Sequence, residues 1–182
     1  MSEALLVRHC SPTLAGLKTA SMFSCPYASE AEMREQLRKL NRVLTEKGLC
    51  VIPLRYHNGK GLIYVYRPQQ LKADLLDGSV CSMLKDRGYP CGDPVRCLNC
   101  LVRRVQDSKE VPHEIGFFLG YPPEDVAGFI EKKTPTACSG PWKVYGDANA
   151  AQQRFDRYKA CTGAYCEALA QGKQLEHLIV AS

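Results

Sequence analysis

Residues 111–130 are the stretch that most constrains how this chain can fold, because three prolines and three glycines interrupt a run of apolar side chains. Pro112 suits the first turn of a helix, where its missing N–H costs nothing, and Gly120 suits the left-handed residue that ends one. Pro122 and Pro123 stop that helix, but they can begin a second one. The stretch therefore predicts two short helices joined by a tight turn.

Two short helices around a turn are also the outline of a DNA-reading helix-turn-helix, but the charges oppose that function. Glu124 and Asp125 would present two carboxylates to the phosphate backbone at the leading end of the second helix. The formal net charge of the whole chain is only +5, and basic residues are scattered among acidic ones, as in residues 30–47. Nucleic acid is therefore not expected as a partner, and we expect a small molecule or another protein instead.

The composition, with 182 residues of which 45% are hydrophobic and 24% charged, is that of one globular domain over residues 1–182. No apolar run approaches the roughly 20 residues that cross a bilayer, so no membrane location is expected. Residues 1–10 contain an acidic residue and only a short apolar stretch, which is not typical of a secretory signal. The ten cysteines are therefore expected to be reduced thiols in the cytoplasm.

Apolar periodicity and turn residues predict the elements of the fold. Residues 4–9 predict a first strand, and a helix follows after Cys10. Residues 29–47 predict the clearest helix, with a capping box at its start. Two β-rich runs, 49–56 and 62–67, flank an Asn-Gly turn and predict a hairpin. Further helices are expected at residues 68–76, 79–88 and 93–105 and from Asp147 onward, with short strands at 142–145 and 175–181.

These elements predict an α/β or α+β fold, in which a small mixed sheet with an antiparallel hairpin at about residues 49–67 is covered by several helices. No Walker loop, Rossmann glycine fingerprint, HExxH pair or GxSxG elbow occurs in the sequence. The commonest nucleotide-binding, zinc-protease and serine-hydrolase mechanisms are therefore not expected.

Cys10 lies where the expected first strand meets the helix after it. A thiol at a helix N-terminus has a lowered pKa, because unpaired N–H groups and the helix dipole stabilise the thiolate. Strand alternation directs His9 away from Cys10, so a base must come from elsewhere, and His113 is the candidate. One hypothesis is therefore an enzyme with Cys10 as nucleophile or redox thiol, His113 as base and Glu114 orienting the imidazole. The open alternatives are an inert buried cysteine and a His113-Glu114 pair that only caps a helix.

Cys97 and Cys100 form the one CxxC of the sequence. This spacing is typical of half a zinc or iron–sulfur site or of a redox dithiol, and Cys91 or Cys138 would complete a metal site. On the expected helix both thiols turn away from the buried stripe, which comprises Val95, Leu98, Val102 and Val105. The second hypothesis is therefore a non-catalytic module that binds zinc, an iron–sulfur cluster or a protein partner through Cys97 and Cys100. The remaining interpretation is that Cys97 and Cys100 have no special role.

Three long motifs occur in one order along the chain: HCSPTLAGLK at residues 9–18, PHEIGFFLGYP at 112–122 and WKVYGD at 142–147. Together they resemble a family of uncharacterised proteins, a domain of unknown function, from anaerobic Firmicutes. The resemblance covers nearly the whole chain and implies a cytosolic protein of an anaerobic bacterium, in which reduced thiols and oxygen-sensitive metal chemistry can persist. It implies no activity and no catalytic residues, and the CxxC is not part of the family's pattern.

The sequence does not identify a substrate. Under the enzyme hypothesis, Lys18 is available for an anionic substrate and Tyr121 for substrate binding. That hypothesis predicts that Cys10 is alkylated faster than the other nine cysteines. A third hypothesis is an interaction protein that uses exposed aromatic side chains near Tyr121 and Trp142.

Overall fold

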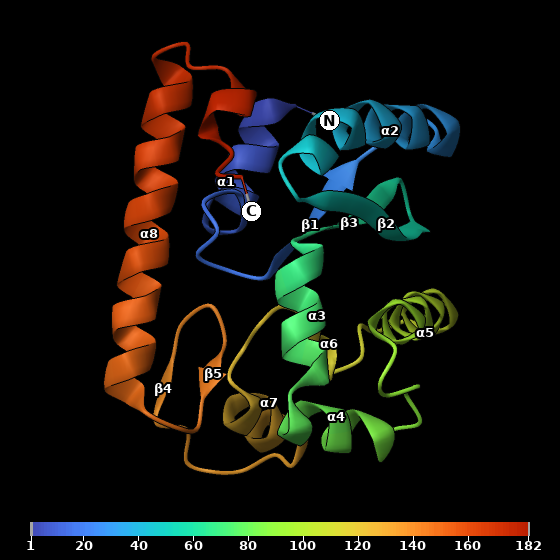
Figure 1. Cartoon of the computed structure of the whole chain (residues 1–182), viewed down its shortest axis with the longest axis vertical. Coiled ribbons are helices and arrows are strands. Elements are labelled where there is room, and N and C mark those ends of the chain that lie inside the picture. Colours follow the sequence, from blue (N-terminus) through green and yellow to red (C-terminus); the bar gives the residue numbers. More distant parts are fainter. Residues whose placement is uncertain (1, 182) are drawn as a thin grey trace. The chain divides into compact units, whose positions relative to one another are not determined.

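The structure, a computed structural model, describes residues 2–181 and divides into two compact units (Figure 1). The first unit comprises the residues up to Gln70 together with those from Ala160 onward, and the second unit runs from Leu71 to Lys159. Each unit contains its own cluster of buried apolar side chains and is described by itself. The expectation of a single domain over residues 1–182 stays a prediction.

The sheet of the first unit contains β1 (Ala20–Pro26), β2 (Cys50–His57) and β3 (Lys60–Tyr66), in the order β1-β3-β2 with both pairings antiparallel. Strands β2 and β3 are the predicted hairpin. Asn58 and Gly59 at its tip have φ values of 48° and 71°, the left-handed conformation that a two-residue type I′ turn requires. The predicted fold class, a small sheet with an antiparallel hairpin and several helices, is confirmed.

The first element of the chain is a helix, α1 (Glu3–Leu14), so the predicted strand at residues 4–9 was wrong. Ser2 caps this helix, because its hydroxyl accepts a hydrogen bond from the Leu5 N–H at 3.3 Å. Pro12 lies in the last turn, where little of the helix remains to be disrupted. The sequence led to the error because a short apolar run does not distinguish a strand from a buried helix. The buried positions follow a helical spacing and include Leu6, Val7, Cys10 and Leu14.

Helix α2 (Glu30–Glu46) packs on the sheet, as the sequence predicted (Figure 1). Ser29 caps it by accepting a hydrogen bond from the Glu32 N–H at 3.1 Å. The Asn41 side chain both donates to the Val51 carbonyl and accepts from the Val51 N–H, each at 2.8 Å, and so ties the helix to β2. Its buried side chains join the core of the first unit and are Met33, Leu37 and Leu44.

Near its C-terminus the chain forms a short 3-10 helix, η1 (Leu175–Leu178), where the sequence predicted a closing strand. The Val180 N–H that follows donates to the Leu14 carbonyl at 3.0 Å. The buried Arg67 side chain donates to the carbonyl oxygens of Thr13 and Leu14 at 2.7 and 2.8 Å. It also donates to the Val180 carbonyl at 2.7 Å, so that one guanidinium joins the end of α1 to the C-terminal segment.

The second unit is mainly helical. Asp93 caps its helix α5 as predicted, by accepting hydrogen bonds from the N–H groups of Val95 and Arg96, both at 3.1 Å. Asp77 caps helix α4, which covers residues 78–85 where the sequence predicted a helix at residues 79–88. The elements after β3, of which α3 and α8 are shared with the first unit, are α3 (Pro68–Leu76), α4 (Gly78–Lys85), α5 (Pro94–Asp107), α6 (Ile115–Phe118), α7 (Pro123–Ile130), β4 (Cys138–Ser139), β5 (Lys143–Val144) and α8 (Ala148–Ala170).

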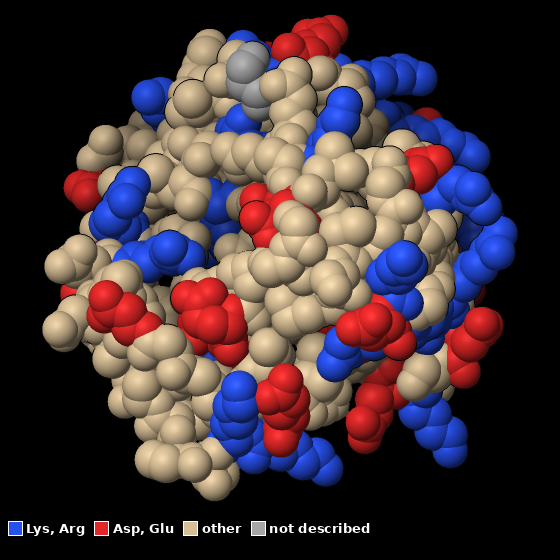
Figure 2. Space-filling model, turned by 60° about the horizontal axis from the view of Figure 1, so that its bottom comes forward, with Lys and Arg blue, Asp and Glu red and all other residues tan. Residues whose placement is uncertain are grey.

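The molecular surface carries charges of both signs. Figure 2 shows Lys and Arg side chains lying beside Asp and Glu over most of the face in view, with basic side chains predominating along its right-hand edge. Within residues 2–181, no helix combines the length and the apolar character that crossing a membrane would need.

Candidate functional site

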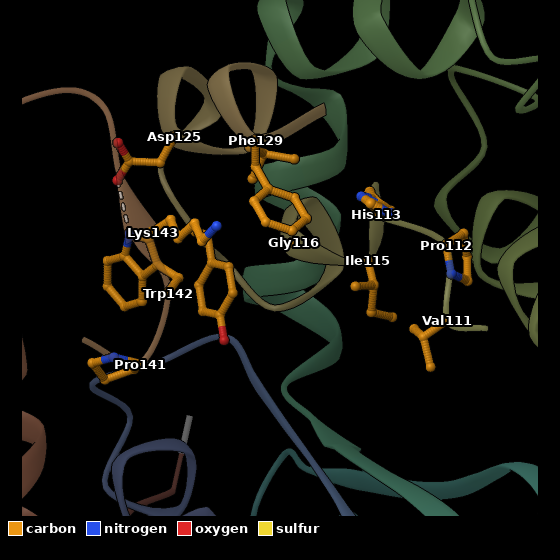
Figure 3. Close-up of a pocket in the computed structure, with 12 residues that line it drawn as sticks. Val111, Pro112, His113, Ile115, Gly116, Asp125, Phe129, Pro141, Trp142 and Lys143 are labelled. Atoms are coloured by element: carbon orange, nitrogen blue, oxygen red, sulfur yellow. Dashed lines mark hydrogen bonds between the residues drawn. The ribbon is translucent and has the colours of Figure 1, made fainter. Parts of the chain in front are cut away.

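A pocket of about 330 Å³ opens in the second unit, where the segment 111–116, helix α7 and residues 141–143 meet. Figure 3 shows His113 and Ile115 on one side of it and Pro141 and Trp142 on the other, with Phe129 and Lys143 between them. The stretch that the sequence singled out as most constrained therefore forms much of the wall of this pocket.

The glycines of this stretch allow two close approaches. Helix α6 begins at Ile115, not at the predicted Pro112, and is a single turn. A Cβ atom on Gly116 would lie 2.7 Å from a methyl carbon of Val126, so α6 can pack on α7 only with glycine at this position. A Cβ atom on Gly128 would lie 2.5 Å from the Tyr145 ring, which closes α7 onto the segment after β5 in the same way.

Asp125 is the polar centre of the pocket wall and is 3% exposed. One oxygen of its carboxylate accepts a hydrogen bond from the Trp142 Nε1–H at 2.7 Å (Figure 3). The other oxygen accepts from the N–H groups of Tyr145 and Gly146 at 2.7 and 2.9 Å. These three N–H donors stabilise the buried carboxylate by hydrogen bonding. The sequence predicted Asp125 only as an acidic residue in the first turn of a helix.

Aromatic rings make up the rest of the wall. Tyr121 stacks on Trp142 with ring centroids 4.6 Å apart and planes 25° apart, and burial raises the pKa of Tyr121 to about 12. The His113 ring lies 4.8 Å from the Phe129 ring at 32°, and the Lys143 ammonium lies 5.7 Å from the same ring. Trp142 is 9% exposed and Tyr121 is half-buried, whereas Phe129 in the same wall is 37% exposed. The hypothesis of an interaction protein stays a prediction.

Glu114 does not line this pocket and contacts Tyr89 and Arg104 instead. Its carboxylate accepts hydrogen bonds from the Tyr89 hydroxyl at 3.0 Å and from Arg104 at 3.1 Å. The Arg104 guanidinium also lies over the Tyr89 ring, 4.3 Å from its centroid. These contacts anchor the segment that carries His113 to α5. The predicted role of Glu114 in orienting the His113 imidazole stays a prediction.

The comparisons with known proteins identify a family. The model of the family described as "Protein of unknown function (DUF3793)" matches residues 6–179. The chain belongs to this family. No curated protein and no solved structure gives a significant match. The DUF3793 match spans every residue that the sequence proposed for a site, including Cys10, His113 and Cys97.

Cys10 of this DUF3793 protein lies in the middle of α1, not at a helix N-terminus, so the premise for an activated thiolate was wrong. Its side chain is fully buried, and this burial raises the pKa of the thiol, although the Lys18 ammonium opposes the rise. Burial lowers the pKa of Lys18 to about 8. Cys10 and Lys18 belong to the first unit, whereas His113 and Tyr121 belong to the second. The pairing of Cys10 with His113 stays a prediction.

Cys10 is expected to react with iodoacetamide about 100-fold more slowly than the half-buried Cys138 in the native protein. The reason is that a thiol buried in the core reacts only after local opening, which costs a few kcal/mol. Quenched labelling followed by peptide mass spectrometry measures both rates in one sample. Labelling of Cys10 at the rate of Cys138 would instead support an accessible, activated thiol.

Cys97 and Cys100 lie on α5, but the buried face of this helix is rotated from the predicted one. Val95 is 69% exposed, whereas Cys97 is 2% exposed and its thiol donates to the Pro90 carbonyl at 3.2 Å. The face is set by the loop before α5, which packs over Cys97. Among the described residues, no group of three or more His, Cys, Asp or Glu side chains is arranged to hold a metal ion. A zinc or iron–sulfur site at Cys97 and Cys100 stays a prediction.

Proposed function

We propose that this protein binds a small, planar organic anion in the pocket around His113. The observation that carries the proposal is the placement of His113 and Lys143, two nitrogen donors, beside the face of Phe129 in a pocket of about 330 Å³. A volume at the lower end of the range for ligand pockets matches a compound with one or two rings.

The charges of the wall favour an anion. The Asp125 carboxylate is buried and already accepts three hydrogen bonds from the protein, so few of its acceptor positions are left for a direct hydrogen bond to a ligand. The Lys143 side chain ends in an ammonium group, a donor without an acceptor, and an imidazole also has an N–H to donate. A carboxylate on the ligand would therefore find its partners in His113 and Lys143.

The aromatic rings favour a planar ligand. Tyr121, Phe129 and Trp142 all line the pocket, and flat rings are attracted to one another when they are stacked or tilted at these separations. Because Tyr121 and Trp142 already stack on each other, the pair presents a rigid wall that loses little side-chain entropy when a ligand binds.

Binding is proposed in preference to catalysis by Cys10. The Cys10 thiol is fully buried and its pKa is raised, which makes it a poor nucleophile at neutral pH. The proposal includes the cytoplasm of an anaerobic bacterium as the location.

Aromatic carboxylates such as benzoate are expected to quench the fluorescence of Trp142, the sole tryptophan, in a saturable manner, whereas the uncharged benzamide is expected to bind more weakly. Lys143→Met should weaken carboxylate binding about five- to tenfold, because the lost pairing of a partly exposed ammonium contributes about 1 kcal/mol. Fluorescence titration measures both affinities, and calorimetry checks them independently.

Lys159→Met is the matched control, since this lysine is exposed on α8 and does not line the pocket. Its affinity for carboxylates should equal that of the unmodified protein. Equal quenching by benzoate and benzamide, or an unchanged affinity in Lys143→Met, would contradict the proposed recognition of an anion. The absence of saturable quenching by any planar ligand would contradict the pocket as a binding site.

A further inference from the structure

Four cysteines of the second unit lie on α4, on α5 and on the loop that joins these two helices. Cys81 lies on α4, Cys91 on the loop between the helices, and Cys97 and Cys100 on α5. The Cys91 thiol donates to the Cys81 carbonyl at 2.8 Å, and the Cys97 thiol donates to the carbonyl of Pro90, the residue before Cys91. The CxxC that the sequence singled out is therefore part of a larger thiol cluster, Cys81, Cys91, Cys97 and Cys100.

The pKa values of Cys91 and Cys97 are shifted in part by the other thiols of the cluster. Burial is the main cause that raises the pKa of Cys91 to about 11. The Cys81 thiol adds to the rise through a hydrogen bond and through its charge, and Cys97 adds to it through its charge, whereas Lys85 opposes it. Burial also raises the pKa of Cys97, with further contributions from Cys100 and Cys81. Thiols that disfavour one another's ionised forms lie close together, because such an interaction falls off with distance.

We propose that Cys81 and Cys91 are a redox-active pair that closes into a disulfide when the protein meets a low-molecular-weight disulfide. Both side chains are partly exposed, whereas Cys97 is buried, so an oxidant reaches Cys81 and Cys91 more readily than Cys97. A disulfide requires Cα atoms about 4.4–6.8 Å apart, which demands some freedom in the backbone. Gly92, next to Cys91, has a φ of 91° and nothing within 4 Å of its Cβ position, so the loop can adjust there.

The reaction is a two-step thiol–disulfide exchange. The thiolate of one cysteine of the pair attacks the reagent disulfide, a mixed disulfide forms, and one reagent thiolate leaves. The thiolate of the other cysteine then attacks the protein sulfur of the mixed disulfide and releases the second reagent thiolate. The two protein sulfurs lose two electrons in total, the reagent disulfide is reduced to two thiols, and the two protons lost from the cysteines end on those thiols.

The test is a disulfide map of the full chain after incubation with oxidised glutathione. Trypsin cleaves after Lys85, Arg87 and Arg96, so Cys81, Cys91 and the Cys97/Cys100 pair fall in three separate peptides. The expected product links residues 73–85 to residues 88–96 and weighs two hydrogen atoms less than the sum of the two peptides. Its formation should be about tenfold faster at about pH 8.5 than at about pH 7.5, because the thiolate fraction rises tenfold per pH unit below the pKa.

The variant Cys91→Ser should abolish this linked peptide, and the matched control Cys138→Ser, a half-buried thiol on β4, should leave its rate unchanged. The unmodified chain alone decides the question if Cys91→Ser does not fold. A link between residues 88–96 and residues 97–103, or a stable glutathione adduct on Cys91 with no internal link, would overturn the assignment of Cys81 as the partner.

Discussion

Asp125→Ala is expected to lower the free energy of unfolding by about 3–5 kcal/mol, because it removes a buried carboxylate and leaves its donors without an acceptor. The indole N–H of Trp142 and the backbone N–H groups of Tyr145 and Gly146 all donate to this carboxylate at 2.7–2.9 Å. Water reaches this site poorly, since Asp125 is 3% exposed. Guanidinium unfolding followed by far-UV circular dichroism measures the change.

Two further variants separate the loss of hydrogen bonds from a general effect of mutation. Asp125→Asn keeps one oxygen for the two backbone donors but turns an NH₂ group toward the Trp142 indole N–H, so a loss of about 2 kcal/mol is expected. Asp147→Asn makes the same chemical change at the exposed cap of α8 and should change stability by less than about 0.5 kcal/mol. A loss below about 1 kcal/mol for Asp125→Ala would mean that Asp125 does not hold the pocket wall together.

The elements that the sequence predicted correctly are those whose signals are local. The caps of α2 and α5 and the Asn58-Gly59 turn each involve residues a few positions apart, so a short segment contains the whole interaction. Helix α1 was missed because a run of apolar residues fits either element until its tertiary partners are known. The buried face of α5 was misplaced for the same reason, since the contact between Cys97 and Pro90 selects it.

The candidate site was predicted in part. His113 and Tyr121 were singled out by sequence, because the density of proline and glycine around them indicated a constrained segment. Asp125 and Lys143 were not recognised as site residues, since the Asp125–Trp142 hydrogen bond joins side chains 17 residues apart, across a loop with no regular spacing. No periodic pattern in the sequence indicates such a pairing. Close packing at Gly116 brings α6 onto α7, and close packing at Gly128 brings α7 onto the segment after β5.

Arg67→Met is the second change with a large expected effect, a loss of about 3–5 kcal/mol in the free energy of unfolding. The Arg67 side chain is 2% exposed and donates to the carbonyls of Thr13, Leu14 and Val180. The first two are among the last carbonyls of α1, which have no partner within the helix and lie at the negative end of its dipole. Chemical denaturation monitored by circular dichroism gives the loss, and Arg38→Met, at an exposed position of α2, is the matched control with an effect below about 0.5 kcal/mol.

The sign of the change in the free energy of unfolding in Arg67→Met shows whether this buried charge stabilises the fold or only costs desolvation energy. Replacing both partners of a buried ion pair by apolar residues is often neutral or stabilising, because the cost of desolvating the charges disappears with them. Here the partners are backbone carbonyls that no substitution removes, so methionine would take a strong donor from each of them. Thr13 would keep only its bond from the Gly16 N–H and Leu14 only its bond from the Val180 N–H. The stability of Arg67→Lys should lie between that of the unmodified protein and that of Arg67→Met. One ammonium cannot reproduce the planar guanidinium that reaches Thr13 and Val180 together. A methionine variant as stable as the unmodified protein would show that water or a shift of the C-terminal segment satisfies these carbonyls, and Arg67 would then not be what joins α1 to that segment.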